Sequence, residues 1–384
     1  MSEYQRYEFM TIDKPLTKVQ LDAVAGLSSH IEVSATRAIV EYNWGDFKYD
    51  PIKVLHEYFD GFLYWANWGS PRFALRFPHG ALPGDLIENY DYDEFVTFTQ
   101  HPDYDILDIH FAEMEPPDEW TEYELGSLIP IRDELMDGDL RALYIAWLAC
   151  QPMFEDYDDE DEEGDEEYDE TAGVPPVPPA LGKPTAAQLA LVELLRVPEE
   201  VFVAAAQHSE AAKLKAKDDF VAWVELLPVD RRKDYLVRLA LNEPGLSRML
   251  AKELRELGGS KTQAAPSTGE RVTYAKLLAE SGAVKARMER ERREQEQQAR
   301  LHRLQDVRDH QEDYWQQVEQ AAARGTGPGY DEAARLLSEL REVADHFKDL
   351  PEFQARFRTW VRSHLRRPAL LKRLQQRKFP LPEA

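Results

Sequence analysis

Residues 155–170 read EDYDDEDEEGDEEYDE, and thirteen of these sixteen residues are acidic. Such a run repels itself and has little apolar surface to bury, so it favours an extended, solvated chain. The prolines of the cluster that follows, VPPVPP at 174–179, fix φ and remove amide donors, which predicts a stiffer spacer. Because the chain is aromatic before this stretch and helical after it, we interpret 153–184 as a disordered acidic and proline-rich linker between two folding units.

The region before this linker, residues 1–152, predicts an acidic α+β domain. Alternating apolar residues predict strands near 7–12, 30–42 and 71–77, and a hairpin around 101–104. Short helices are expected after Thr17 and at Asp50-Pro51, where an N-cap precedes proline at the first helical position. One wide apolar face predicts that the second of these helices carries Val54, Leu55, Tyr58, Phe59, Phe62 and Trp65.

The region after the linker predicts helices alone. We expect a small helical bundle over 185–258, a polar linker over 259–272, a long helix over 273–323 and a basic helical tail, folded as a terminal hairpin, over 330–384. The middle of the long helix, 289–296, has no apolar residue, which does not support a heptad coiled coil. Opposite charges three and four residues apart favour a solvated single helix whose ends dock separately.

The net charge of −26 is distributed unevenly along the chain. Residues 1–171 contain 10 Lys/Arg against 41 Asp/Glu, whereas residues 172–384 contain 36 against 31. A chain with this asymmetry attracts oppositely charged partners, its own tail included. No apolar run approaches the roughly 18–20 residues of a membrane span, and the first residues lack a secretory pattern, so we expect a cytoplasmic protein without a membrane partner.

Sequence motifs give no clear activity. The chain has no GxxxxGK[ST] phosphate loop, no GxGxxG after a strand and no GxSxG nucleophile elbow. Its one cysteine, Cys150, lies in an apolar run, which indicates a buried small hydrophobe and excludes both an internal disulfide and a cysteine zinc site. The sequence leaves open whether the chain is an enzyme, favours a non-enzymatic role, and predicts no cofactor.

Asp108 and His110 share one face of a predicted strand and offer oxygen and nitrogen metal ligands. The favoured interpretation is a polar, solvent-facing strand in an acidic domain. We therefore predict no metal site, and an enzyme built on these two residues remains a third possibility.

A short pattern, Asn-Trp-Gly, occurs at 43–45 and again at 67–69. Asn and Gly tolerate positive φ, so both copies indicate turns, and the favoured interpretation is that a tryptophan pins each turn. The functional alternative is a shared aromatic pocket formed by Asn43, Trp44, Asn67 and Trp68.

The basic tail is the best-supported interaction feature, because 352–378 contains nine basic residues and one acidic residue. An aromatic stripe would be buried while arginines stay exposed. The residues predicted to bind a partner are Arg356, Arg358, Trp360, Arg362, Arg366 and Arg367. The open alternatives are a solvated face, contact with an acidic protein or the chain's own acidic linker, and nucleic-acid binding, which the negative first half disfavours.

Several segments carry a resemblance: YEF at 7–9 and IDKPL at 12–16, EYNWGDF at 41–47, YWANWG at 64–69, SLIP at 127–130 and GDLR at 138–141. In these segments the chain resembles a family of uncharacterised bacterial proteins. Its tail, with YDEA at 330–333 and RRP at 366–368, is similar to the ending of some bacterial SWIM zinc-finger proteins, although the zinc ligands of SWIM proteins are absent. The resemblance implies no activity and hints that the tail is a docking module.

Together these features predict a non-enzymatic interaction or adaptor protein that bridges partners through oppositely charged domains. Its expected partner is a protein, acidic where it meets the tail. The alternative is a nucleic-acid-associated accessory protein that uses the basic C-terminal helices.

Overall fold

The computed structural model describes residues 3–82, 88–90, 92, 95–112, 114, 120–154, 173–211, 219–241, 246–258 and 269–381. It divides the chain into two compact units, Met1–Val284 and Lys285–Ala384. The predicted fold class, an α+β domain followed by a helical region with a long helix, is confirmed. The acidic stretch 155–172 and most of the second predicted linker, 259–268, lie outside the described residues.

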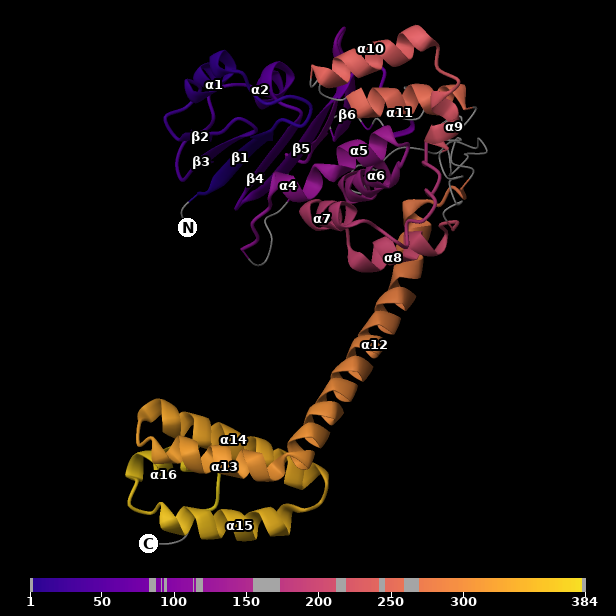
Figure 1. Ribbon diagram of the computed structural model, residues 1–384. Coiled ribbons are helices and arrows are strands. Elements are labelled where there is room, and N and C mark those ends of the chain that lie inside the picture. The colour runs from indigo at the N-terminus through magenta and orange to yellow at the C-terminus, as the bar shows by residue number, and fades with distance from the viewer. Residues whose placement is uncertain are drawn as a thin grey trace. The chain divides into compact units, whose positions relative to one another are not determined.

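A seven-stranded antiparallel sheet, with strand order β2-β3-β1-β4-β5-β7-β6, forms the centre of the first unit (Figure 1). The predicted hairpin around 101–104 is confirmed, because it joins the last two strands in the sequence. The first strand lies between the third and the fourth and runs antiparallel to both. Its first residue therefore lies beside the last residues of both neighbours. The strands are β1 (Gln5–Met10), β2 (Ile31–Val33), β3 (Arg37–Tyr42), β4 (Gly61–Ala66), β5 (Gly69–Pro78), β6 (Val96–Gln100) and β7 (Tyr104–His110).

Helices cover both faces of this sheet. On one face, α1 (Lys18–Ala25) and α2 (Pro51–Tyr58) share a core with Phe9 and Phe62. Both helix starts are as predicted. Thr17 forms a capping box at the start of α1, and the Asp50 side chain accepts from the Ile52 N–H in the first turn of α2. The opposite face holds α4 (Leu125–Leu128), α5 (Pro130–Met136) and α6 (Arg141–Phe154), and η1 (Glu88–Tyr90) packs against α6.

The prediction that one helix continues through Phe62 and Trp65 is wrong. Helix α2 ends at Tyr58, and both aromatic residues lie on β4. The Asp60 N–H donates to the Met10 carbonyl at 2.8 Å, which starts the new strand beside β1. A strand buried on both faces has a continuous apolar run, and such a run cannot be distinguished from a buried helix by periodicity.

The five helices between residues 186 and 257, which follow the acidic stretch, belong to the first unit. The predicted boundary at 153–184 therefore differs from the division in the structure, which lies between Val284 and Lys285. Val177 and Leu181 are 1% and 0% exposed, so the proline-rich part of the predicted linker packs instead of staying solvated. The helices are α7 (Ala186–Leu194), α8 (Glu199–Gln207), α9 (Phe220–Val224), α10 (Val229–Ala240) and α11 (Leu246–Leu257).

Polar contacts explain why α7 joins the α+β domain. Gln188, fully buried, donates to Glu134 at 2.8 Å and to Asp139 at 3.1 Å. Arg141 also donates to the carbonyls of Ala180 and Lys183, at 3.1 and 2.7 Å. These long-range contacts leave no sequence periodicity, which is why the sequence alone suggested a separate bundle.

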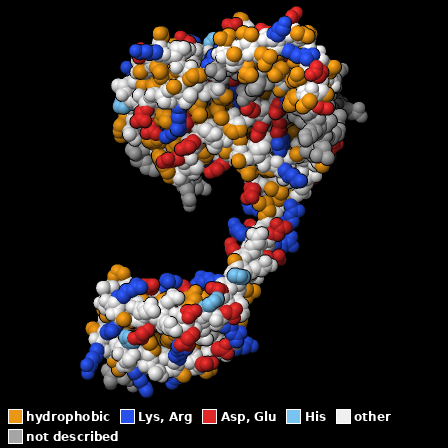
Figure 2. All heavy atoms as spheres, in the orientation of Figure 1, with side chains coloured by type: hydrophobic (Ala, Val, Ile, Leu, Met, Phe, Trp, Pro, Cys, Tyr) orange, Lys and Arg blue, Asp and Glu red, His pale blue; other side chains and the backbone are white. Residues whose placement is uncertain are grey.

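The long polar helix is confirmed as α12 (Tyr274–Asp309), although the predicted 273–323 helix is interrupted at His310, after which α13 (Gln311–Ala323) begins. Leu277 and Val284 are buried near its start, and Leu304 and Val307 near its end. Residues 291–300 between them are all exposed, and Figure 2 shows basic and acidic side chains together along this helix. The helix therefore contributes apolar residues to two separate cores, one at each end.

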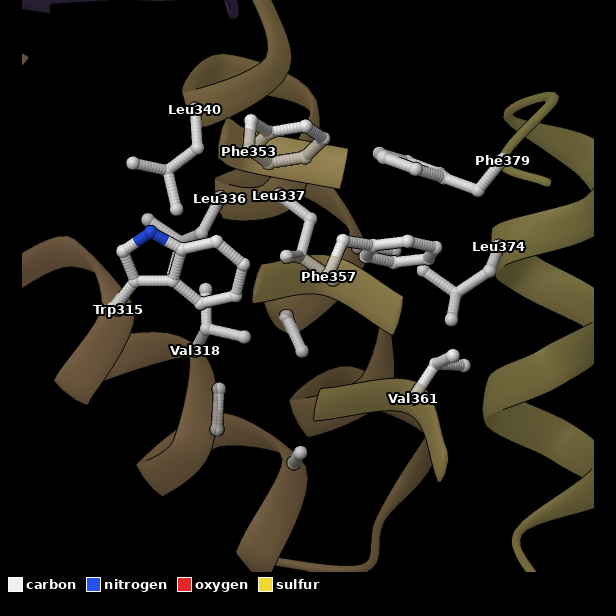
Figure 3. Close-up of a cluster of buried hydrophobic side chains, with 14 of the residues drawn as sticks. Trp315, Val318, Leu336, Leu337, Leu340, Phe353, Phe357, Val361, Leu374 and Phe379 are labelled. Atoms are coloured by element: carbon white, nitrogen blue, oxygen red, sulfur yellow. The ribbon is translucent and has the colours of Figure 1, made fainter. Parts of the chain in front are cut away.

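The second unit is a helical bundle with one core (Figure 3). The core joins α13 and the last turns of α12 to α14 (Gly327–His346), α15 (Leu350–Ser363) and α16 (Pro368–Gln376). The predicted terminal hairpin is thus part of a larger bundle, because Trp315 packs against Phe353 with ring centroids 5.8 Å apart. In the part of the chain that the structure describes, no helix is long and apolar enough to span a membrane.

We expect the first turns of α12 to respond to pH through His208. Its ring nitrogens lie 2.7 Å from Glu280 and 2.9 Å from Glu270. The hydrogen bond to Glu280, followed by that to Glu270, raises the pKa of His208 although burial opposes it. The stabilisation is present below the ordinary histidine pKa of about 6.5 and is lost as pH rises through the raised folded value.

Hydrogen exchange of 274–284, corrected for intrinsic rates, tests this prediction. Protection should fall between pH 6 and pH 9 in the natural chain and should change little over that range in His208→Gln. An equal pH dependence in both proteins would show that another group is responsible.

Candidate functional site

Three of the six residues predicted to bind a partner are held inside the second unit. Arg356 donates to Glu312 at 2.7 and 2.8 Å and lies 4.7 Å from the Trp315 ring centroid. The Trp360 indole donates to Glu319 at 2.7 Å. Arg367 donates to the Ala322 carbonyl. These contacts join α15 and the following turn to α13, so their main role is to hold the bundle together.

The other three predicted residues, Arg358, Arg362 and Arg366, face solvent. Their spacing of four residues places Arg358 and Arg362 on one line along α15, and Arg366 follows in the next turn. Arg358 donates to the carbonyl of Gln354, one turn earlier. None of the three has an acidic partner among the residues that the structure describes. We call these three residues the arginine stripe.

Several other arginines of the bundle are engaged within it, unlike those of the stripe. Arg324 pairs with Glu332 at 2.6 Å, and Arg373 pairs with Asp331 at 2.5 Å. Arg341 lies 4.2 Å from the Phe379 ring centroid and donates to two backbone carbonyls. The second unit as a whole contains 21 Lys/Arg against 17 Asp/Glu, a balance of +4. The three residues of the stripe contribute to this excess positive charge without an acidic partner in the described part of the unit.

The geometry of the stripe suits an acidic chain. The four residues from Arg358 to Arg362 rise about 6 Å along α15, which is the length of about two residues of extended peptide, and Arg366 lies in the turn after the helix. A guanidinium group can bind a carboxylate through two parallel hydrogen bonds. Lys372, Arg377 and Lys378 on and after α16 are also exposed.

The two Asn-Trp-Gly turns lie at the same end of the sheet. Gln5 at the start of β1 is in register with Tyr42 on one side and with Ala66 on the other, and each turn begins one residue later. Asn67 forms two bonds with Tyr4: its side chain accepts from the Tyr4 N–H at 3.0 Å, and its own N–H donates to the Tyr4 carbonyl at 2.9 Å.

The other turn is held by Gln5, which is 3% exposed. Its side-chain amide donates to the Gly45 carbonyl at 2.5 Å and to Asp46 at 3.1 Å. Gly45 has a φ of +81°, a conformation that favours glycine. Trp44 and Trp68 are 72% and 38% exposed, so amide groups, rather than the indoles, pin these turns. Asn43 is also exposed, and the predicted residues form an open surface.

Asp108 is committed to an ion pair. Arg72 on the neighbouring strand donates to both of its carboxylate oxygens, at 2.6 to 3.2 Å. Across the described ranges, no three His, Cys, Asp or Glu side chains are grouped so that they could hold a metal ion. Cys150 is fully buried, and burial raises its pKa to about 12, which disfavours the reactive thiolate.

A buried charged network that the sequence did not indicate closes the opposite end of the sheet. Arg76 donates to Asp60 at 2.8 Å, and Asp60 also accepts from the N–H groups of Ile12 and Asp13, at 2.5 and 2.9 Å. Burial alone would raise the pKa of Asp60, but Arg76 and these N–H groups outweigh it and lower the pKa. Arg132, 1% exposed, pairs with Asp13 at 2.6 Å. We interpret the network as structural, since every charge in it has a partner.

Sequence reasoning also missed the residues that position the two candidate surfaces. Glu312 accepts from Arg356, and Glu319 accepts from Trp360. The two glutamates are seven residues apart, which places them on one face of the helix, and this spacing was visible in the sequence. Tyr4 and Gln5 carried no such signal, because their roles depend on strand order.

Comparison of the chain with protein-family models, with curated proteins and with solved structures found no match. The functional conclusion therefore depends on the geometry of the chain itself.

Proposed function

We propose that the chain is a non-enzymatic interaction protein whose C-terminal unit binds an acidic segment of a partner protein through the arginine stripe. The observation that carries this proposal is the segregation of Arg358, Arg362 and Arg366, which are exposed and have no acidic partner in the described chain. Neighbouring arginines such as Arg356 and Arg373 are paired internally. Unpaired, exposed guanidinium groups in a row are available for carboxylates of another chain.

The charge balance supports an adaptor with two different surfaces. The first unit contains 25 Lys/Arg against 55 Asp/Glu, a balance of −30, whereas the second has +4. Two units of opposite charge select different partners and bring them together by their covalent connection. We also propose that the chain is a bacterial cytoplasmic protein and that it belongs to the family of uncharacterised bacterial proteins that its sequence resembles.

Nucleic acid is the less favoured ligand because the unit offers few aromatic faces beside the stripe. Single-strand binders stack bases on exposed aromatic side chains. Phe357 is 1% exposed, and Trp360 bonds to Glu319 and stacks on His364 at a centroid distance of 4.3 Å. The acidic first unit also repels phosphates.

Fluorescence anisotropy with two labelled probes tests the proposal on the full chain: a twelve-residue glutamate-rich peptide and a single-stranded DNA of equal charge. Replacing Arg358, Arg362 and Arg366 by glutamine should weaken peptide binding about tenfold at low salt, since each lost ion pair contributes roughly 0.2–1 kcal/mol. Because the stripe is exposed, the fold should be retained.

A matched control removes the same charge from the exposed part of α12. Arg287, Arg292 and Arg293 pair with glutamates one turn away on α12, so their replacement by glutamine should leave peptide binding within about twofold. Equal losses of peptide affinity in both triple variants would show that net charge, and not the position of the stripe, determines binding. Tighter binding of the DNA, lost on removing the stripe, would favour the nucleic-acid alternative.

A further inference from the structure

A second surface lies in the first unit, where Trp44 and Trp68 are exposed at one end of the sheet. An indole exposed to water on a rigid turn brings no packing energy to its own fold. Trp is also the residue most enriched, with Tyr and Arg, at the energetic centres of protein interfaces. We infer that these indoles form a binding surface for a basic, arginine-bearing peptide segment of a partner protein.

The backbone presents both indoles rigidly. One turn is anchored by the paired bonds between Asn67 and Tyr4, and the other by the bonds from Gln5 to Gly45 and Asp46. Because the anchors are the consecutive residues Tyr4, just before β1, and Gln5, its first residue, the two turns are fixed relative to each other. A preorganised surface loses little conformational entropy when a ligand binds.

Sheet geometry sets the separation of the two turns. Strands β3 and β4 are the two neighbours of β1, so their ends lie about two strand spacings, or about 10 Å, apart. An extended peptide covers that distance in about three residues. Side chains three residues apart point to opposite sides of a regular extended chain, so a flexible, glycine-rich segment is needed for two arginines to meet both indoles.

Charge selects the ligand. The segments that carry this surface, 3–6, 41–50 and 64–70, contain four acidic residues (Glu3, Glu41, Asp46 and Asp50) against two basic residues (Arg6 and Lys48). Arg6 and Glu41 pair with each other at 2.7 Å, which leaves Glu3, Asp46 and Asp50 against Lys48. The rest of the unit is strongly acidic as well, which disfavours anions and favours cations.

Indole faces and carboxylates together suit a guanidinium group. A cation within about 6 Å of an indole centroid is attracted by the ring, and arginine makes this contact more often than lysine. Trp120, 58% exposed, is a further indole near this end of the sheet, since its ring lies 5.2 Å from that of Tyr4. Proline-rich peptides and sugars also pack on indoles, but neither uses the surrounding negative charge.

Isothermal titration of the full chain with a capped Gly-Arg-Gly-Gly-Arg-Gly peptide tests this inference. We expect saturable binding that weakens about fivefold to thirtyfold in the double variant Trp44→Ala/Trp68→Ala, in which the charge of the protein is unchanged. The same peptide with citrulline in place of arginine should bind the natural chain no more tightly than the arginine peptide binds the double variant. Citrulline keeps the shape of arginine and loses its charge. A charge-neutral control, Val221→Ala, truncates another exposed apolar side chain and should leave the affinity unaltered.

Three outcomes would overturn the inference. Unchanged affinity in the double variant would mean that the peptide binds through the overall negative charge of the protein and not through the indoles. Equal affinity for the citrulline peptide would remove the role of the cation. Tighter binding of a proline-rich peptide or of maltotetraose would assign the surface to another ligand class. The thermal transition of the double variant, measured alongside, should match that of the natural chain because both side chains are exposed.

Discussion

Replacement of Phe357 by alanine is expected to unfold the C-terminal unit and to leave the first unit folded. Phe357 is 1% exposed, and its ring packs against those of Phe353 and Phe379, with centroids 6.0 and 4.9 Å away (Figure 3). Removing a buried phenylalanine ring costs about 3–5 kcal/mol, which is comparable to the stability of a small domain.

Hydrogen exchange with mass spectrometry separates the two units in this experiment. Segments in 311–376 should lose protection in Phe357→Ala, whereas β1, β4 and β5 should keep theirs. Leu365→Ala is the matched control, because Leu365 lies in the same region and is 47% exposed; it should cost less than about 0.5 kcal/mol. Loss of protection in the sheet as well would show that the two units fold as one.

In the first unit the largest effect is expected at Asp60. Asp60→Ala leaves the buried Arg76 guanidinium without its carboxylate and removes the acceptor of two backbone N–H groups. Breaking a buried ion pair from one side costs about 3–5 kcal/mol. Urea unfolding, followed by the fluorescence of the buried Trp65 and its neighbours, measures the loss.

The pH dependence provides a second readout of the same group. Because the folded pKa of Asp60 is lowered, its stabilisation is present above the ordinary aspartate pKa of about 3.9 and disappears as pH falls through the folded value. The stability difference between the natural chain and Asp60→Asn should therefore shrink in acid. Asp108→Ala, which breaks a pair with more exposed partners, should cost less; an equal cost would contradict the importance of burial.

Local signals in the sequence predicted local structure well. The caps at Thr17 and Asp50, the β6–β7 hairpin and the polar middle of α12 each depend on residues close together in the chain. The sequence could not predict that β4 continues where a helix was expected, because a strand covered on both faces has the same apolar run. Nor could it place α7 against α4, α5 and α6, since Gln188 contacts residues about 50 positions earlier.

The candidate surfaces were predicted as residue sets, and the structure divides each set. Six tail residues separate into three that hold the bundle and three that form the stripe. Contacts with α13 make the difference: Glu312 accepts from Arg356, Glu319 from Trp360 and the Ala322 carbonyl from Arg367. Likewise, the Asn-Trp-Gly repeat indicated two turns, but only the order of β3, β1 and β4 shows that both turns share one end of the sheet.

The most direct test of the account is a quantitative affinity purification of the full chain at moderate salt, with partners identified by mass spectrometry. The natural chain, the stripe variant Arg358→Gln/Arg362→Gln/Arg366→Gln and the α12 control variant are compared under identical conditions. The account predicts a partner protein with an acidic segment that is recovered with the natural chain and the control and is depleted at least fivefold with the stripe variant. Recovery of the same proteins in equal amounts from all three would contradict it.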